Sequence, residues 1–217
     1  LADITKLRKM SGAGMMDCKN ALEEAGGDFD KAMEIIRKKG QAVAAKRSDR
    51  EAAEGCVLAV ENGGFAAIVA VKCETDFVAK NADFIAMTQS FLDIAIANKP
   101  ASKDELLAIP LSDGRTVENH ITDRVGVTGE KMELGFYEFV KDVSAISYIH
   151  PGNNLATIVA FNKEVDRQVA RDIAMQVAAM NPVSVTSADV PQNVIDSEME
   201  IARDKARQAG KPENLLD

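Results

Sequence analysis

Few residues of this sequence could carry out chemistry. Cys73 with His120 or His150 could form a thiolate pair, although a cysteine at the end of a strand is more often a small buried hydrophobe. Glu74 and Asp76 have the residue types of an acid/base pair, although carboxylates just before a helix are more often caps. P-loop, zinc-protease, serine-hydrolase and EF-hand motifs do not occur. The sequence therefore predicts no catalytic residue, no metal ligand and no cofactor.

Two adjacent methionines, Met15 and Met16, follow the loop 11–14. The Gly-Ala-Gly of this loop begins like a dinucleotide fingerprint, but it follows no strand and lacks the third glycine. Adjacent side chains on a helix point about 100° apart, so both methionines cannot enter one narrow core stripe. An exposed methionine beside Arg8 and Lys19 indicates a protein contact, and filling of the core stays open as the alternative.

Composition and charge exclude several classes of protein. The chain has 217 residues, 46% of them hydrophobic and 28% charged, which is typical of one large or two unequal globular domains. The first fifty residues carry 11 Lys/Arg against 8 Asp/Glu, whereas the whole chain has a net charge of −8. This acidity disfavours direct binding of nucleic acid, because neutralising phosphates needs a large basic excess. The asymmetry suggests separate modules with different partners.

Location and redox state follow from what the sequence lacks. It has no apolar run near the roughly 18 residues that cross a bilayer and no signal-peptide pattern at Leu1, so we expect a cytoplasmic protein without membrane contact. The three cysteines are far apart and form no CxxC pair, which argues against a disulfide scaffold or a thiolate zinc site.

Helical periodicity indicates three short helices in the first forty residues. Ile4, Leu7 and Met10 form the inner face of the first, and the second resumes at Met15. Asp28 is expected to cap the third, whose inner face holds Phe29, Ala32, Met33, Ile35 and Ile36 and which we expect to end before Gly40. Residues 41–54 are expected to form a helical or extended linker.

Two hairpins and two helices indicate an internal repeat. Strands 56–60 and 65–73 flank an Asn-Gly turn, and strands 144–149 and 155–161 flank a second turn. Helices are expected over 79–98 and 165–180, and a last helix over 191–210. Residues 101–130 are expected to form shorter helical pieces and loops, followed by a further strand over 132–140. The alternation predicts an α+β fold with two related subdomains, each a hairpin-based antiparallel sheet packed with helices. We expect domains at 1–50, 51–140 and 141–217.

The two copies differ at one corner. The strand segment 65–71 matches 155–161 at an offset of 90 residues. The helix segment 85–87 matches 173–175 at an offset of 88 residues. The first copy therefore holds two additional residues, which fall within Thr75 to Asp83. Functional residues concentrate on loops held by rigid elements, so Asp76 and Phe77 become candidates for a binding site. The alternative is structural, with Phe77 a hydrophobic staple and Asp76 a helix cap.

Two stretches resemble the bacterial elongation factor Ts family, namely residues 7–22 and Cys73-Glu-Thr-Asp-Phe-Val-Ala-Lys-Asn81. The likeness continues to about residue 210. It implies a nucleotide exchange factor for the GTPase elongation factor Tu, with a UBA-like N-terminal domain and a core of two subdomains. The family also carries a helical hairpin and a C-terminal module beyond the segment seen here.

The resemblance assigns roles to individual residues. Arg8, Met15, Met16 and Lys19 would grip a helix of the GTPase beside its guanine pocket. Asp76 and Phe77 would enter between helices near the Mg²⁺ and phosphate end, and residues 173–180, with Met175 and Gln176, would hold another GTPase domain. The sequence departs from the family at Gln176, where many members have histidine, so a role that rests on imidazole is in doubt.

Three functions remain open on the sequence. The leading one is the exchange factor, which makes and breaks no covalent bond and is not an enzyme in that sense. The second is a passive adaptor whose UBA-like module docks a helical or ubiquitin-like partner without exchange activity. The third is a thiol enzyme built on Cys73. A homodimer is left open.

Overall fold

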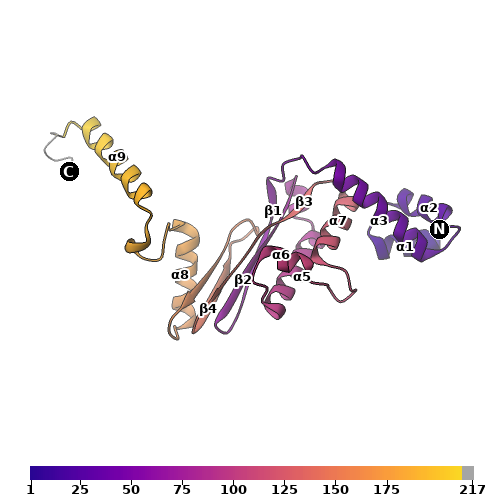
Figure 1. Ribbon diagram of the computed structural model, residues 1–217, viewed down its shortest axis with the longest axis horizontal. Coiled ribbons are helices and arrows are strands. Elements are labelled where there is room, and N and C mark those ends of the chain that lie inside the picture. The colour runs from indigo at the N-terminus through magenta and orange to yellow at the C-terminus, as the bar shows by residue number, and fades with distance from the viewer. Residues whose placement is uncertain (212–217) are drawn as a thin grey trace. The chain divides into compact units, whose positions relative to one another are not determined.

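The computed structural model describes residues 1–211 and divides the chain into two compact units, Leu1–Ala178 and Ala179–Asp217. The described part combines helices with two antiparallel sheets (Figure 1). This confirms the predicted α+β class. The likeness of the first three helices to a UBA domain and the boundaries of the three predicted domains stay predictions, and residues 212–217 of the third domain lie outside the described residues.

The first unit begins with three helices around a small core. They are α1 (Ala2–Ser11), α2 (Met15–Glu24) and α3 (Phe29–Lys46). Gly12, with φ of 70°, ends α1 in the left-handed conformation, and the Asp28 carboxylate caps α3 by accepting the Lys31 N–H at 3.1 Å. The buried side chains of this core are Leu7, Ala13, Cys18, Ala21, Leu22 and Ala32.

The third helix is longer than predicted. It continues through Gly40 to Lys46, so the expected end before Gly40 is wrong. Gly40 is buried against Gly126 of α7 (Val117–Thr128), where a Cβ added to residue 126 would lie 2.5 Å from the Gly40 Cα. A pair of glycines lets the two helix backbones meet, and this packing outweighs the tendency of glycine to end a helix.

A three-stranded antiparallel sheet follows, in the order β1 (Glu54–Asn62), β2 (Phe65–Cys73) and β3 (Met132–Lys141). The predicted first hairpin is present, but Asn62 pairs with Phe65 inside the ladder, so the turn consists of Gly63 and Gly64 rather than Asn-Gly. Gly63 has φ of 61°, and a Cβ on Gly64 would lie 1.9 Å from the Asp142 carbonyl oxygen. Two glycines are needed because one takes positive φ and the other touches neighbouring backbone.

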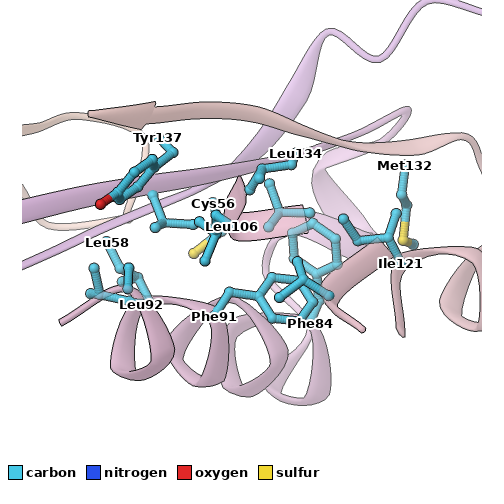
Figure 2. Packing of buried hydrophobic residues seen from close by; sticks show 14 of the residues in the cluster. Cys56, Leu58, Phe84, Phe91, Leu92, Leu106, Ile121, Met132, Leu134 and Tyr137 are labelled. Atoms are coloured by element: carbon cyan, nitrogen blue, oxygen red, sulfur yellow. The ribbon is translucent and has the colours of Figure 1, made fainter. Parts of the chain in front are cut away.

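Helices cover one face of this sheet. They are α5 (Ala82–Asn98), α6 (Lys103–Ala108) and α7, and Figure 2 shows Phe84, Phe91 and Leu92 of α5 pointing toward the strands. Each of these three side chains is at most 1% exposed, so α5 is fixed to the sheet by apolar burial. The Tyr137 hydroxyl donates to the Pro100 carbonyl at 2.8 Å, which satisfies the polar end of a buried ring.

The second hairpin, β4 (Ser144–Ile149) and β5 (Ala156–Phe161), is followed by α8 (Arg167–Met180). Both copies of the repeat thus have a hairpin and then a helix. Only the first copy inserts an additional helical turn between them, α4 (Asp76–Ala79). The helix predicted from residue 79 therefore begins later, at Ala82 of α5, and residue 79 is the last residue of α4. The second unit contains a 3-10 turn, Ser187–Asp189, and α9 (Gln192–Gln208).

Candidate functional site

The corner between β2 and α5 is built from two consecutive helix caps. The Thr75 hydroxyl accepts the Val78 N–H at 3.4 Å and begins α4. The Asn81 side chain then accepts the N–H groups of Asp83 and Phe84 at 2.9 and 3.4 Å and begins α5. Both caps satisfy backbone N–H donors within the corner itself. They therefore stabilise a single helical turn, α4, at the end of a buried strand.

Phe77 projects from this turn into solvent. Its side chain is 84% exposed, whereas Ala79 of the same turn is 8% exposed. A staple would require burial of the ring against α5, and the cap of α4 is Thr75 rather than Asp76, so the structural alternative for these two residues is wrong. An exposed phenylalanine on an ordered turn is available for contact with another molecule.

Asp76 lies beside Phe77 in the same turn. Its carboxylate accepts a hydrogen bond from the Lys80 ammonium at 2.7 Å, and this bond and the Lys80 charge hold the pKa of Asp76 below its usual range. An ion pair this open to water contributes little to stability. The carboxylate is therefore ionised at neutral pH and can exchange Lys80 for a donor on a partner.

Glu74, two residues before Asp76, is held by other segments of the chain. Its carboxylate accepts the Lys131 N–H at 2.6 Å and pairs with Arg50 at 3.0 Å and Arg47 at 3.4 Å. The Lys131 N–H bond, followed by the two arginines, lowers the pKa of Glu74. Glu74 is thus neither a cap nor an acid/base partner of Asp76, because it is engaged by three groups on other segments.

We expect acid to weaken the fold partly through Glu74. A carboxylate whose pKa is lowered in the folded state stabilises the fold above its unfolded pKa of about 4.3, and this stabilisation is lost as the pH falls through the lowered value. Glu74→Gln is therefore expected to lower the free energy of unfolding at pH 7 and to flatten its decline between about pH 5 and pH 3. Urea unfolding at several pH values measures this. The exposed Glu24→Gln is the control, and identical pH profiles for the two variants would contradict the assignment.

The second group of predicted residues lies on α1 and α2. Arg8 is exposed, Met15 is 38% exposed and Met16 is 63% exposed, so Met16 does not fill the core. Lys19 is also exposed and lies 3.7 Å from Glu23 in an ion pair one turn further along. The structure thus presents Met15, Met16 and Lys19 on the first turns of one helix.

Met10 is exposed, although the sequence predicted it to be buried. The helical spacing with Ile4 and Leu7 indicated an inner-face position, but Met10 is 54% exposed. It lies one residue before the end of α1, where the chain turns away at Gly12 and leaves little neighbouring core to cover it. A position in the last turn before a glycine is the signal that could have shown this.

On α8 the predicted residues divide between two faces. Ala170 and Ala174 are buried against the second hairpin, and the Ala174 carbonyl accepts the Thr157 hydroxyl at 2.9 Å. Met175 is half-buried, whereas Gln176 is exposed. The structure therefore leaves only Gln176 of this pair fully open to solvent.

Two apolar residues share the exposed face of α8 with Gln176. Ile173 belongs to the segment 173–180 that the resemblance indicated, whereas Val169 was missed. Val169 is 51% exposed and Ile173 is 38% exposed. Their spacing of four and then three residues places them and Gln176 on one stripe of a helix. This spacing is visible in the sequence and could have identified the stripe.

Comparison with known proteins places these residues in a family. A family model described as Elongation factor TS matches residues 74–217. A protein named Elongation factor Ts from Porphyromonas gingivalis is 71% identical over 217 residues, covering 100% of this chain and 79% of the relative. Proteins of the same name from Phocaeicola vulgatus and Bacteroides fragilis are 62% and 60% identical over 208 residues, 95% of this chain and 63% of each relative. The chain belongs to the elongation factor Ts family.

Membership of the elongation factor Ts family places the chain among the elongation factors of protein synthesis. The family match begins at Glu74, so it includes the corner with Asp76 and Phe77 and the stripe on α8. Arg8, Met15, Met16 and Lys19 precede the matched region, but the relative from P. gingivalis aligns over the whole chain. The names of these relatives denote an elongation factor.

Cys73 of this elongation factor Ts family member is not suited to nucleophilic chemistry. The thiol is fully buried, donates to the Thr75 carbonyl at 3.3 Å, and has a pKa raised to about 11 by burial and by the charge of Glu130. The histidines bond elsewhere, His120 to Asp113 at 3.2 Å and His150 to Tyr148 at 2.9 Å. A protonated, inaccessible thiol is not a nucleophile at neutral pH.

Within residues 1–211, no group of three or more His, Cys, Asp or Glu side chains is arranged to hold a metal ion. No helix of the same described part is long and apolar enough to cross a bilayer.

Proposed function

We propose that this protein is a guanine-nucleotide exchange factor that binds elongation factor Tu and promotes release of GDP. Membership of the elongation factor Ts family supports the partner, and one structural observation carries the mechanism. Phe77 is 84% exposed on a capped helical turn at the end of a buried strand, next to an ionised Asp76. The turn presents an aromatic ring and a carboxylate to another protein from a fixed base.

The mechanism needs no bond-making by this chain. A GTPase holds the phosphates of GDP through backbone N–H groups, a lysine and Mg²⁺. A shift of about 1 Å in a helix that carries these ligands misplaces them and weakens the nucleotide. We propose that Phe77 enters between two helices of the GTPase and that Asp76 binds a donor released by this movement.

Two further surfaces would keep the GTPase in place. Arg8, Met15, Met16 and Lys19 present adaptable apolar and basic groups on α1 and α2, suited to the side of a helix. On α8, Gln176 together with Met175 would contact a second domain of the GTPase, with the exposed Val169 and Ile173 extending that contact. Linkage requires that GDP weakens binding of this chain by the same factor by which the chain weakens GDP. Nucleotide can therefore expel the exchange factor after each round.

Release of a fluorescent GDP analogue from elongation factor Tu, with and without this chain, tests the proposal. We expect the release rate to rise with the concentration of the chain and to saturate, because release then occurs from a bound complex. A release rate that stays constant while the two proteins bind would contradict exchange.

That outcome would support the adaptor function instead. The exposure of Met15 and Met16 alone would suit a passive docking module, which binds without altering the nucleotide. The exposed Phe77 favours the exchange factor, because an adaptor that docks through α2 has no use for it.

A further inference from the structure

Glu130, two residues after the end of α7, accepts hydrogen bonds from the corner between β2 and α5. Its carboxylate accepts the backbone N–H groups of Glu74 and Thr75 at 3.2 and 3.1 Å, and it accepts the Thr75 hydroxyl at 2.6 Å. Three donors from two consecutive residues thus converge on one carboxylate. Hydrogen bonds to an ionised acceptor are about twice as strong as neutral ones.

The binding is reciprocal. The Glu130 carboxylate accepts hydrogen bonds from the backbone N–H groups of residues 74 and 75. In return, the Glu74 carboxylate accepts a hydrogen bond from the backbone N–H of Lys131 at 2.6 Å. Glu74 is also paired with Arg47 and Arg50 of the segment that follows α3. We call these contacts the Glu74–Glu130 network. It joins the end of β2, the start of β3 and the segment after the three-helix core.

The network ends at the residue that starts α4. The Thr75 hydroxyl donates to Glu130 and at the same time accepts the Val78 N–H at 3.4 Å. The orientation of Thr75 therefore fixes the direction in which the single turn 76–79 leaves the strand. Phe77 has no burial of its own to hold it, so its direction depends on this turn.

We propose that Glu130 is a positioning residue for exchange, acting through Phe77. This inference rests on the proposed function. A ring that separates two helices of a partner must resist the force with which they close. On a hinged turn the ring would fold back against its own surface, whereas on a turn held by three charge-assisted hydrogen bonds it transmits the displacement.

A double-mutant cycle on GDP release tests this role. Glu130→Ala is expected to lower the maximal rate of release at saturating chain about tenfold and to change the half-saturating concentration less than about threefold. In the Phe77→Ala background, Glu130→Ala should lower the rate by no more than about twofold, because the side chain through which it acts is gone. Equal factors in the two backgrounds would show a general structural role and overturn the proposal.

Two controls keep the test decisive. Glu133→Ala removes a neighbouring carboxylate that pairs with the side chains of Lys72 at 3.5 Å and Lys131 at 3.7 Å. Neither ion pair involves residues 74–77 or the Lys131 backbone N–H, so this variant should leave release unchanged. Glu130→Gln keeps the shape and one acceptor oxygen in case the alanine variant does not fold, and it should show the same pattern with a smaller loss. If Glu130→Gln is silent in both backgrounds, the proposal is wrong.

Amide hydrogen exchange separates this inference from the function on which it rests. The N–H groups of Glu74 and Thr75 should exchange at least about tenfold faster in Glu130→Ala than in the unsubstituted chain, while amides within α5 stay unchanged. Unchanged exchange at residues 74 and 75 would overturn the positioning role whatever the activity. If the unsubstituted chain does not accelerate GDP release, the proposed function itself has failed.

Discussion

Asp76→Ala combined with Phe77→Ala is expected to lower the acceleration of GDP release by about 30-fold or more, the loss typical of a central aromatic contact. The fold should persist. Phe77 is 84% exposed and the ion pair of Asp76 with Lys80 is open to solvent, so the free energy of unfolding should change by less than about 0.5 kcal/mol. Release kinetics of the fluorescent nucleotide and urea unfolding measure the two quantities.

A matched variant distinguishes the corner from exposed aromatic surface in general. Phe136 of β3 is 62% exposed, so Phe136→Ala removes a similar ring from another part of the same sheet. It should leave the acceleration within about twofold of the unsubstituted protein. If the double variant at the corner retains full activity, or if Phe136→Ala loses as much, the insertion of Phe77 is the wrong mechanism.

The position of this corner could be predicted from the sequence because the repeat supplies an internal reference. The two copies share strand and helix, and the offset changes only between them, where α4 is inserted in the structure. The chemistry within the corner was less predictable. Three neighbouring polar residues, Glu74, Thr75 and Asp76, could each cap a helix, and spacing alone does not show which one stands at the first position.

The Glu74–Glu130 network could not be predicted from local sequence patterns. The carboxylate of Glu130 lies 55 residues from Thr75 in the chain, and Glu130 lies in neither of the two stretches that carry the family resemblance. Its existence depends on α7 ending beside the corner, which follows from the antiparallel pairing of β3 with β2. Periodicity shows that a strand is present but not which partner residues its ends bring together.

The surface residues show the same limit. The sequence left open whether Met16 is exposed or fills the core. Helical spacing shows that Met15 and Met16 cannot both be buried, but it does not show which of them is exposed. Burial of Met10 was predicted wrongly for a related reason. Its spacing suits the core, yet the core of a three-helix unit this small does not reach the end of the first helix.

The end of α3 was predicted wrongly because glycine can either end a helix or allow close packing within one. At Gly12 it ends a helix with positive φ, whereas at Gly40 it allows another backbone to approach, and the sequence around Gly40 resembles a helix end. The deciding residue is Gly126, which is remote in sequence and comes close only when α7 crosses α3. A conflict between local pattern and tertiary packing was settled by packing.

Gly126→Val is therefore expected to lower the free energy of unfolding by about 2 kcal/mol, the cost of overpacking a close contact. A Cβ at residue 126 would lie 2.5 Å from the Gly40 Cα, and a backbone atom cannot rotate aside, so α3 has to move. Because α3 carries the core beside Met15 and Met16, the variant should also raise the concentration of chain needed for half-maximal GDP release. Urea unfolding and release titrations measure both effects.

Gly135→Val is the control for that substitution. A Cβ there would lie 2.7 Å from carbons of the Lys72 side chain, which is flexible and can turn away. Gly135 has no partner residue on β2 at the register shift and no positive φ, so a side chain there meets no backbone restriction of that kind. Its effect on stability should be less than about 1 kcal/mol, the span of strand preferences. If Gly126→Val proves as mild as Gly135→Val, the α3 and α7 backbones do not cross this closely. The three-helix core and the corner would then not be held at a fixed separation, and the surfaces on α2 and α4 would have to bind the GTPase independently.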